Sequence, residues 1–399
     1  MDPIDELLTR GVDTIYPTKD ALEKILRSGN KLRLFQGFDP TGTQLHIGHM
    51  VGFRKLRQFQ LLGHHVIFLI GDGTGLSGDP SGKLTARDRF LTREELRKNA
   101  TDYVKQAAKV VRFDGANPVE ILFNGDWLIP MQTPQWLDLL GRFSLQQLAE
   151  RDIFDKRLKE GKDVNMREFV YPLLQGYDSV AMKIDLEIGG TDQTFNMLAG
   201  RKLVREILAK EKYVMTLPLL ADSQGRKIGK TEGNVIAITS PANDLFGMIM
   251  SLPDDVIIKC FEYITDLSMA EVNKIEQAIR GGQNPMIFKK KLAFTLVAML
   301  NSEQQAMKAQ EYFEKTYQKG QLSSADLPTV SHSTLPTNVK IVDFLIQTDL
   351  VESRAEAKRL LVQKAVEYNN QVITDNNFQI SPSSGDIIKV GKKRHLKLV

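Results

Sequence analysis

The sequence predicts an α/β protein built on a parallel sheet, followed by an α-helical region and a small basic α+β unit. Strand-like and helix-like segments alternate over the first half, whereas residues 241–319 show helical periodicity without strand signals. A Ser/Thr/Pro-rich stretch then precedes the basic C-terminal unit. Because alternating strands and helices form parallel sheets covered on both faces, ligands are expected beyond the carboxyl ends of the strands.

The composition describes a folded chain with room for two or three domains. Of its 399 residues 42% are hydrophobic and 26% are charged, which excludes an intrinsically disordered protein. Cys260 is the single cysteine, so an intramolecular disulfide and a Cys-rich metal site are both excluded. The first residues are acidic, and no apolar run approaches the ~20 residues that span a membrane. We therefore expect a cytoplasmic protein without a membrane partner.

Apolar periodicity places the elements of the first half in order. The helix after the first strand rests on Met50, Phe53, Leu56 and Phe59, which recur at three-residue spacing before Gly63. The predicted strands are 32–37, 66–70, 119–123 and 213–220, and a charged helix begins near Thr92. A site is expected in the loops that follow the first three strands, namely 37–49, 71–87 and 124–127.

The second half divides into helices, a linker and a compact end. A capping box, Ser353 to Glu356, opens an apolar helix there, and Asn369-Asn370 is typical of a hairpin turn. The other predicted elements are helices at 254–263, 269–280 and 287–319, a linker at 321–338, and strands at 386–390 and 395–399.

The positive charge is concentrated at the C-terminal end. The chain carries a net charge of +4, and residues 339–399, with ten Lys/Arg and seven Asp/Glu, supply +3 of it. A basic end on a near-neutral body indicates contact with a polyanion, with a merely solvated C-terminus as the alternative.

Two phosphate-binding patterns in the glycine-rich loop are false leads. Residues 73–78 satisfy G-x-G-x-x-G after a strand, but turn formers follow at 79–82, so no helix can open there to hold a pyrophosphate. The phosphate-loop pattern ending at Lys83 fails because Ser77 replaces its first glycine and Leu84 replaces the magnesium-binding hydroxyl.

The tetrapeptide His46-Ile47-Gly48-His49 opens an amphipathic helix after a strand. Histidines three residues apart lie on one face of the first turn, where they add hydrogen-bond donors to the positive end of the helix dipole. This suits phosphate oxygens, and Gly48 leaves room for an adenine ring. Two surface histidines are the alternative; a zinc pair lacks a third ligand nearby.

A second motif, Gly225-Arg226-Lys227-Ile228-Gly229-Lys230-Thr231, decides between these alternatives. Two lysines three residues apart in a glycine-flanked loop can close over a triphosphate and neutralise charge that develops in the transition state. Alone the motif is an exposed basic turn. Together, the two motifs resemble the signature of class I aminoacyl-tRNA synthetases.

The middle of the chain narrows the resemblance. Residues 171–179, Tyr-Pro-Leu-Leu-Gln-Gly-Tyr-Asp-Ser, and 189–193, Gly-Gly-Thr-Asp-Gln, are similar to bacterial-type tyrosyl-tRNA synthetases. Residues 353–360 are similar to the ribosomal-protein-type RNA-binding module of these enzymes. The resemblance implies a Rossmann-like nucleotide-binding catalytic domain over 1–240, a helical tRNA-binding domain over 241–320, the linker over 321–338 and the small RNA-binding domain over 339–399.

The resemblance also implies a two-step reaction. L-tyrosine and ATP give tyrosyl-adenylate and pyrophosphate, and the tyrosyl group then moves to the 3′-terminal adenosine of tRNA(Tyr). ATP is a substrate accompanied by Mg²⁺, and no organic cofactor is implied. The positions matched to catalysis are His46, His49, Lys227, Lys230, Thr231, Lys83 and Arg87, and those matched to ATP binding are Thr41, Gly48, Asp192 and Lys230.

The tyrosine pocket is matched with one departure. In the family, Asp178 accepts the phenol hydroxyl, and the position of Phe35 holds tyrosine or, in another branch, lysine. Phe35 has no polar atom, so we expect recognition of the hydroxyl to rest on Asp178 with water or Asn124. The matched positions are Phe35, Gly37, Asp39, Asp79, Asn124, Tyr171, Gln175, Asp178 and Gln193, of which Asp79, Tyr171, Gln175 and Gln193 surround the α-ammonium.

A homodimer and a tRNA contact follow from the same resemblance. The segment near 127–165 matches a dimer-forming insertion, whose apolar surface would come from Trp127, Trp136, Leu139, Leu140 and Phe143 unless these are core residues. The positions expected to contact tRNA are Arg354, Lys358, Arg359, Lys392, Lys393 and Arg394.

Three other functions compete. A tryptophanyl-tRNA synthetase shares both signatures but usually lacks the equivalent of Asp178 and the C-terminal module. A synthetase-derived RNA-binding protein would not need His46, His49 and the two lysines. A nucleotidyltransferase shares the first motif but leaves the basic end unexplained.

Overall fold

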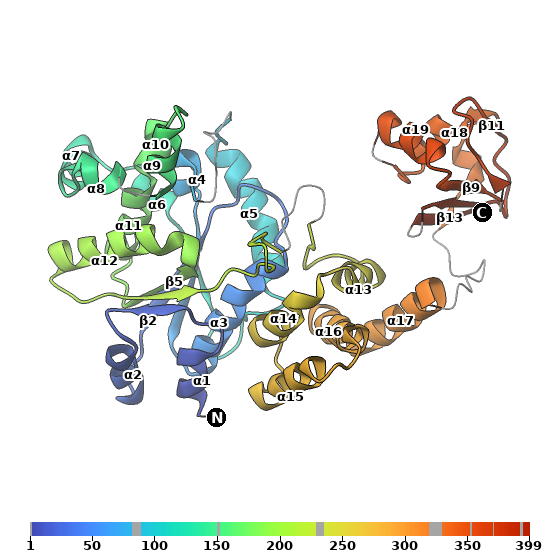
Figure 1. Cartoon of the computed structure of the whole chain (residues 1–399). Coiled ribbons are helices and arrows are strands. Elements are labelled where there is room, and N and C mark those ends of the chain that lie inside the picture. Colours follow the sequence, from blue (N-terminus) through green and yellow to red (C-terminus); the bar gives the residue numbers. More distant parts are fainter. Residues whose placement is uncertain are drawn as a thin grey trace. The chain divides into compact units, whose positions relative to one another are not determined.

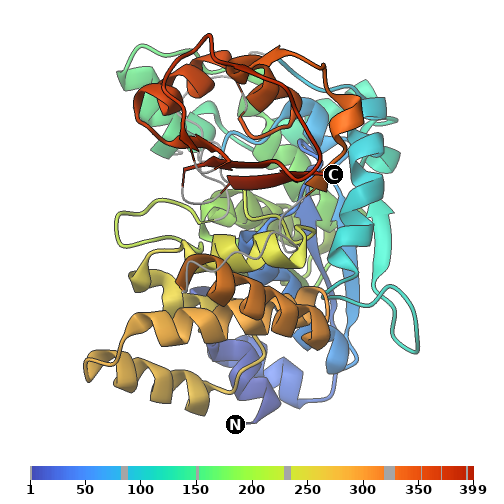
Figure 2. The ribbon, with the colours of Figure 1, turned by 90° about the vertical axis from the view of Figure 1, so that its right-hand side faces the viewer.

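The computed structural model describes residues 2–81, 89–149, 152–228, 235–318, 329–351, 353–369, 371–391 and 394–399. The chain forms two compact units, Met1–Met307 and Lys308–Val399, shown in two views in Figures 1 and 2. Each unit has a sheet and a hydrophobic core of its own. No described helix combines the length and apolar character needed to cross a membrane.

The first unit is organised around a six-stranded sheet in the order β1-β6-β5-β2-β3-β4. All neighbouring strands run parallel except β1, which pairs antiparallel with β6 at one edge. The prediction of a parallel sheet is thus confirmed, while the edge strand, only three residues long, carried too little pattern to be predicted. The strands are β1 (Thr14–Tyr16), β2 (Arg33–Phe38), β3 (His65–Ile70), β4 (Glu120–Phe123), β5 (Leu186–Gly190) and β6 (Tyr213–Leu217).

Helices cover both faces of this sheet. On one face Phe35 packs with Ile184, which follows α11 (Tyr171–Ala181). On the other face Phe53 of α3 (Met50–Leu61) contacts Phe38 and Phe68, whose rings stack with centroids 4.4 Å apart. Because successive strand residues point to opposite faces, the central strands are buried on both sides.

The remaining helices of the α/β part are short apart from α5 and α12. Thr92 caps α5 through a reciprocal bond with Glu95, as the predicted start near Thr92 requires. The helices are α1 (Pro3–Thr9), α2 (Lys19–Arg27), α4 (Thr74–Ser77), α5 (Arg93–Ala107), α6 (Gly125–Leu128), α7 (Thr133–Gly141), α8 (Leu145–Ala149), α9 (Asp152–Lys159), α10 (Met166–Phe169) and α12 (Thr194–Leu208), with 3₁₀ turns η1 (Ile47–His49) and η2 (Thr191–Gln193).

In the helical region, the α-helices over residues 242–300 pack against one another (Figures 1 and 2). One helix predicted for this region is divided in two. The single helix predicted at 287–319 is wrong. Asn301, with φ −129° and ψ −89°, leaves the helical conformation, and the Ser302 hydroxyl accepts from the Gln305 amide to start a new helix. The elements are α13 (Ala242–Met250), η3 (Asp254–Val256), α14 (Ile257–Ile264), α15 (Met269–Arg280), α16 (Pro285–Leu300), α17 (Glu303–Phe313) and the π turn η4 (Glu314–Gln318).

The second unit is a small α+β fold. In Figure 1, α18 and α19 lie together over one face of a five-stranded sheet in the order β10-β9-β12-β13-β7. Ser353 caps α19, and Asn369, at φ +49°, turns the chain between β9 and β10 as predicted. The elements are β7 (Thr329–Val330), η5 (His332–Thr334), β8 (Val339–Lys340), α18 (Ile341–Gln347), α19 (Arg354–Val362), β9 (Val366–Tyr368), β10 (Gln371–Val372), β11 (Gln379–Ile380), β12 (Ile387–Val390) and β13 (Arg394–Leu398), with β8 and β11 paired separately.

Candidate active site

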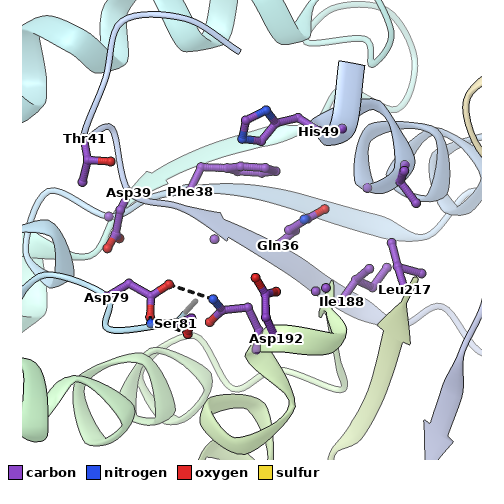
Figure 3. Close-up of a pocket in the computed structure, with 18 of the residues that line it drawn as sticks. Gln36, Phe38, Asp39, Thr41, His49, Asp79, Ser81, Ile188, Asp192 and Leu217 are labelled. Carbon is purple, nitrogen blue, oxygen red and sulfur yellow. Dashed lines mark hydrogen bonds between the residues drawn. The ribbon is translucent and has the colours of Figure 1, made fainter. Parts of the chain in front are cut away.

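A cavity of about 640 Å³ opens at the carboxyl ends of β2, β3, β5 and β6. In Figure 3, His49 lies on one side of it and Asp79 and Asp192 lie on the other. Most of the predicted site residues that the structure describes line this one cavity: Phe35, Gly37, Asp39, Thr41, His46, Gly48, His49, Asp79, Asn124, Tyr171, Gln175, Asp178, Asp192, Gln193 and Lys227. The topology therefore gathers residues that are far apart in the sequence.

The first signature motif forms the turn η1 that leads into α3. The Nδ1 atom of His46 accepts from the Gly48 amide at 3.2 Å, and the Nδ1 atom of His49 accepts from the His46 amide at 3.1 Å. Each neutral ring therefore carries its proton on Nε2, as a hydrogen-bond donor. At Gly48 a Cβ atom would lie 3.0 Å from the His46 ring and 3.3 Å from the Ile228 carbonyl oxygen, so a side chain there would press on the protein itself as well as on a nucleotide.

The described part of the second signature motif, 225–228, approaches the first at the Ile228 carbonyl, which lies beside Gly48. The chain that follows the second motif also contacts the first. Ala237 forms an antiparallel bridge with His46, and the Ile47 amide donates to the Ile236 carbonyl at 3.0 Å. On the other side of the motif, a tight turn at 222–226 and the Ile228 amide, which donates to Leu220 at 2.7 Å, direct Lys227 into the cavity. Lys230 and Thr231, together with Lys83 and Arg87 of the other basic loop, lie outside the described residues.

Lys227 and Asp192 form an ion pair at 2.8 Å. Both side chains are partly exposed, so the pair is weak in water and can be replaced by a charged ligand. The predicted ribose carboxylate and one predicted phosphate lysine thus neutralise each other in this structure.

The opposite end of the cavity is closed by a buried carboxylate. Asp178, on α11, is 1% exposed and accepts from Trp127 Nε1 at 2.8 Å and from Asn124 Nδ2 at 3.0 Å. Burial raises the pKa of the Asp178 carboxyl well above its usual range, against the two donors, which favour ionisation. Asn124 is itself fixed because its carbonyl oxygen accepts from the Gly73 amide.

Between these ends the side chains form polar contacts along one wall. The Tyr171 hydroxyl donates to Asp39 at 2.9 Å, and burial raises the pKa of Tyr171 well above its usual range. Gln193 donates to Asp79 at 2.8 Å, and Asp79 also accepts from the amide and hydroxyl of Ser81. Two carboxylates and a phenol thus line the cavity, each held by its own hydrogen bonds.

Several lining residues were not predicted from the sequence. The Gln36 amide oxygen is buried without a hydrogen-bond partner among the described residues, and it faces α3 at Gly52, where a Cβ atom would lie 2.2 Å away. Glu187 lines the cavity and pairs with buried Lys212. Gln36 and Glu187 are polar residues within strands. In the sequence, nothing in their spacing distinguishes them from polar residues on a solvent-exposed face.

The comparisons agree with this geometry. Residues 27–318 match the model of class I tRNA synthetases of the tryptophan and tyrosine group, and residues 339–388 match the S4 domain. The chain belongs to this synthetase family. Two tyrosine–tRNA ligases, from Dehalococcoides mccartyi strain CBDB1 and Aquifex aeolicus strain VF5, are each 39% identical to it, covering 99% and 100% of this chain and 98% and 100% of their own lengths.

Solved structures show the same fold for this class I synthetase. A C-terminally truncated mitochondrial tyrosyl-tRNA synthetase from Aspergillus nidulans has a TM-score of 0.64 at 21% identity, over 78% of this chain and 93% of its own. The Archaeoglobus fulgidus enzyme complexed with L-tyrosine has a TM-score of 0.61 at 21% identity, over 78% of this chain and all of its own.

In this synthetase the insertion near 127–165 is partly core. Trp127 lies behind the cavity, since its indole donates to Asp178 and it packs against the Phe35 cluster. Leu139 belongs to a separate buried cluster, against which Trp136 and Phe143 pack, whereas Leu140 is exposed. The alternative that these side chains are core therefore holds for most of them.

In the C-terminal part of the chain that contains the S4 domain, the S4 unit, the basic side chains differ in whether they are paired. Lys358 and Arg359 on α19 are exposed, while Arg354 pairs with Asp343. Arg394 donates to Glu356 at 2.8 Å and to the Leu350 carbonyl at 2.7 Å. Lys392 and Lys393 lie outside the described residues.

Proposed function

We propose that this chain is a tyrosine–tRNA ligase, which activates L-tyrosine with ATP and transfers the tyrosyl group to the 3′-terminal adenosine of tRNA(Tyr). The observation that carries the proposal is the buried Asp178 carboxylate at one end of a cavity whose other end holds both signature motifs. A buried acceptor opposite a triphosphate-binding motif fits an amino acid with a polar group at its tip. Transfer of radiolabelled tyrosine to tRNA(Tyr), and to no other tRNA, is the test.

The amino acid is placed with its phenol at Asp178 and its α-ammonium between Asp79, Tyr171, Gln175 and Gln193. A buried ammonium requires a compensating carboxylate, which Asp79 supplies. Phe35 and Gly37 of β2 contribute the apolar wall and an open backbone position beside the ring, and Asp39 orients Tyr171. The substrate carboxylate then points toward the nucleotide end of the cavity.

The activation step needs no protein nucleophile. The substrate carboxylate, with a pKa of about 3.5, is ionised at neutral pH. It attacks the α-phosphorus of ATP, the bond to the bridging oxygen breaks, and pyrophosphate leaves. The Nε2–H groups of His46 and His49 and the ammonium of Lys227 stabilise the charge that develops on the phosphates, with Thr41 beside them. Gly48 borders the nucleotide. When ATP binds, Asp192 would give up its ion pair with Lys227 and accept hydrogen bonds from the ribose hydroxyls instead.

We propose that Mg²⁺ enters with ATP, bound to its phosphates. Among the described residues no group of three or more His, Cys, Asp or Glu side chains is arranged to hold a metal ion. The phosphate oxygens of ATP are ligands of the kind that Mg²⁺ prefers. Lys230, Thr231, Lys83 and Arg87 are proposed to close over the phosphates from the two loops.

Replacing Lys227 by alanine is expected to lower the rate of adenylate formation about 100-fold while the KM for tyrosine stays within about twofold. The lysine binds the phosphates most strongly when their charge redistributes, so its loss affects the chemical step. Stopped-flow measurement of adenylate formation checks this. Arg226→Ala removes a cation from the same turn, one paired with Asp222 outside the cavity, and should change the rate little. Equal losses in the two variants would refute the assignment.

We also propose a homodimer formed through the insertion. In the part of the chain that the structure describes, α7 and α8 expose Leu137, Leu140 and Leu145, at 64%, 39% and 67%. Large apolar side chains exposed on α7 and α8 are the kind of surface that an interface buries.

We propose the cytoplasm as the location of the protein. The single cysteine, Cys260, is a buried free thiol, which agrees with a reducing compartment.

Light scattering of the full chain at micromolar concentration is expected to give twice the 45.0 kDa chain mass. The double variant Leu137→Glu/Leu145→Glu should give the single-chain mass, because buried unpaired carboxylates destabilise the interface. Leu61→Glu is the matched control, since Leu61 is 68% exposed on α3, outside the insertion. A wild-type mass of one chain would refute the dimer.

A further inference from the structure

A buried ion pair lies beside the pocket at the position of Phe35. In the parallel register of β2 and β5, Phe35 is the direct partner of Glu187, which lines the cavity. Glu187 is 1% exposed and pairs with the ammonium of Lys212, which is fully buried just before β6 and lies 6.0 Å from the Phe35 ring centroid. A charged pair thus stands beneath the apolar residue that occupies the family's polar position.

The protein is built around this lysine. Its ammonium donates to Glu187, to the Ser179 hydroxyl at 2.7 Å and to the Met197 carbonyl at 3.2 Å, so all three protons are used. At Gly200 a Cβ atom would lie 2.5 Å from the ammonium nitrogen. The close approach of α11 and α12 therefore leaves a slot of the right size for the charge.

The pair is connected to the substrate wall through amides. Glu187 Oε1 accepts from Gln175 Nε2 at 2.9 Å, so the Gln175 carbonyl oxygen must face the other way. There it accepts from Asn196 Nδ2 at 2.9 Å, and Asn196 also donates to the Gln193 carbonyl at 2.8 Å. With Gln193 donating to Asp79, every carbonyl in this chain has a fixed direction.

We propose that Lys212 is a positioning residue for amino-acid binding: by holding Glu187 as an anion, it fixes the orientation of Gln175, and through Asn196 that of Gln193, so that Gln175, Gln193 and Asp79 keep their places in the cavity wall beside the substrate ammonium. The inference rests on the proposed function, which places the ammonium beside Gln175. An amide has no intrinsic preference between its two orientations, so the acceptor at one end decides it. Lys212 itself does not line the cavity.

Without Lys212, Glu187 would be a buried acid facing only acids and neutral groups. On α11 it faces Asp178, Ser179 and Gln175, β2 presents Phe35, and α12 presents the Met197 carbonyl through the lysine slot. Burial and the nearby Asp178 would both favour the protonated form. A protonated Glu187 donates, and Gln175 would then turn its carbonyl toward Glu187 and its NH₂ toward the Asn196 amide, which is also a donor. The contacts that hold Gln175, Asn196 and Gln193 beside Asp79 would then be lost.

The test is Lys212→Met, which keeps length and removes charge, measured by tyrosine-dependent pyrophosphate exchange and by tyrosine binding through tryptophan fluorescence. The KM and Kd for tyrosine should rise about 10- to 100-fold at pH 6.5, with the KM for ATP unchanged. Relative to wild type, the KM for tyrosine should fall as pH rises to 8.5, because Glu187 ionises and Gln175 returns. The control is Lys210→Met, two residues before Lys212. It removes a partly exposed lysine that pairs with Asp185, and it should behave as wild type.

The double variant Lys212→Met/Glu187→Gln controls for folding, since it removes both buried charges and is expected to remain as stable as wild type within a few °C. It should bind tyrosine weakly and without the pH dependence of the single variant. A tyrosine KM within twofold of wild type in both variants overturns the proposal, as does a pH-independent loss shared with ATP. Wild-type protein without tyrosine-dependent exchange would instead refute the proposed function.

Discussion

Replacing Asp178 by alanine is expected to lower kcat/KM for tyrosine about 100-fold and to change that for phenylalanine less than about threefold. The carboxylate is the buried acceptor for the phenol hydroxyl, and Phe35 offers no second polar partner. When phenylalanine enters the wild-type pocket, this acceptor loses its ligand, which costs about 1–3 kcal/mol or more for a charged group. The variant has no acceptor to leave unpaired, but the Trp127 and Asn124 donors lose their shared partner instead. These two effects offset each other for phenylalanine, so the preference for tyrosine narrows mainly because tyrosine is used less well.

Pyrophosphate exchange with both amino acids and both proteins measures this change. Trp127 and Asn124 lose their shared acceptor in the variant, so thermal unfolding must be followed in parallel. Phenylalanine activity is the internal control, because a general loss of folded protein would lower both rates equally. A tyrosine preference that survives unchanged would show that Asp178 is not the partner of the hydroxyl.

Removal of the S4 unit is expected to abolish tRNA charging and leave adenylate formation within about twofold of wild type. Every described residue that lines the cavity belongs to the first unit, so we expect activation not to need the second. Because β7 pairs with β13, the truncation should end at Gln318 rather than within the linker, to avoid an unpaired strand.

A charge variant of the full chain separates RNA binding from folding. Lys358 and Arg359 are exposed on α19, so Lys358→Gln/Arg359→Gln should weaken tRNA binding and reduce its salt dependence by about one phosphate contact per lost cation. Lys24→Gln, which removes an exposed cation from α2 of the α/β part, is the matched control. Full charging by the truncated protein would show that the basic unit has no part in the reaction.

Much of the fold followed from local patterns. The alternation of buried strands with α3 and α5, the cap at Thr92 and the turn at Asn369 all obey short-range rules of periodicity and capping. The break at Asn301 was not predicted, because the helical pattern was extended through Asn301, although Ser302 begins α17 with a local capping contact to Gln305.

The candidate site was predictable where motifs place polar groups next to strand ends. Trp127 and Lys212 were not, for opposite reasons. Trp127 looked like apolar surface of an insertion, whereas the indole N–H completes the environment of Asp178. Nothing in the sequence distinguishes Lys212 from a surface lysine. The burial of its ammonium depends on the close packing of α11 and α12. Both roles depend on contacts between residues far apart in the sequence.

The most direct test of the central claim is pyrophosphate exchange into ATP, measured with each of the twenty amino acids in turn. We expect tyrosine alone to support rapid exchange, with phenylalanine and tryptophan slower by about 1,000-fold or more, because neither fills a cavity that ends in the Asp178 acceptor as tyrosine does. Exchange that is fastest with tryptophan, or that is absent with every amino acid, would contradict the account.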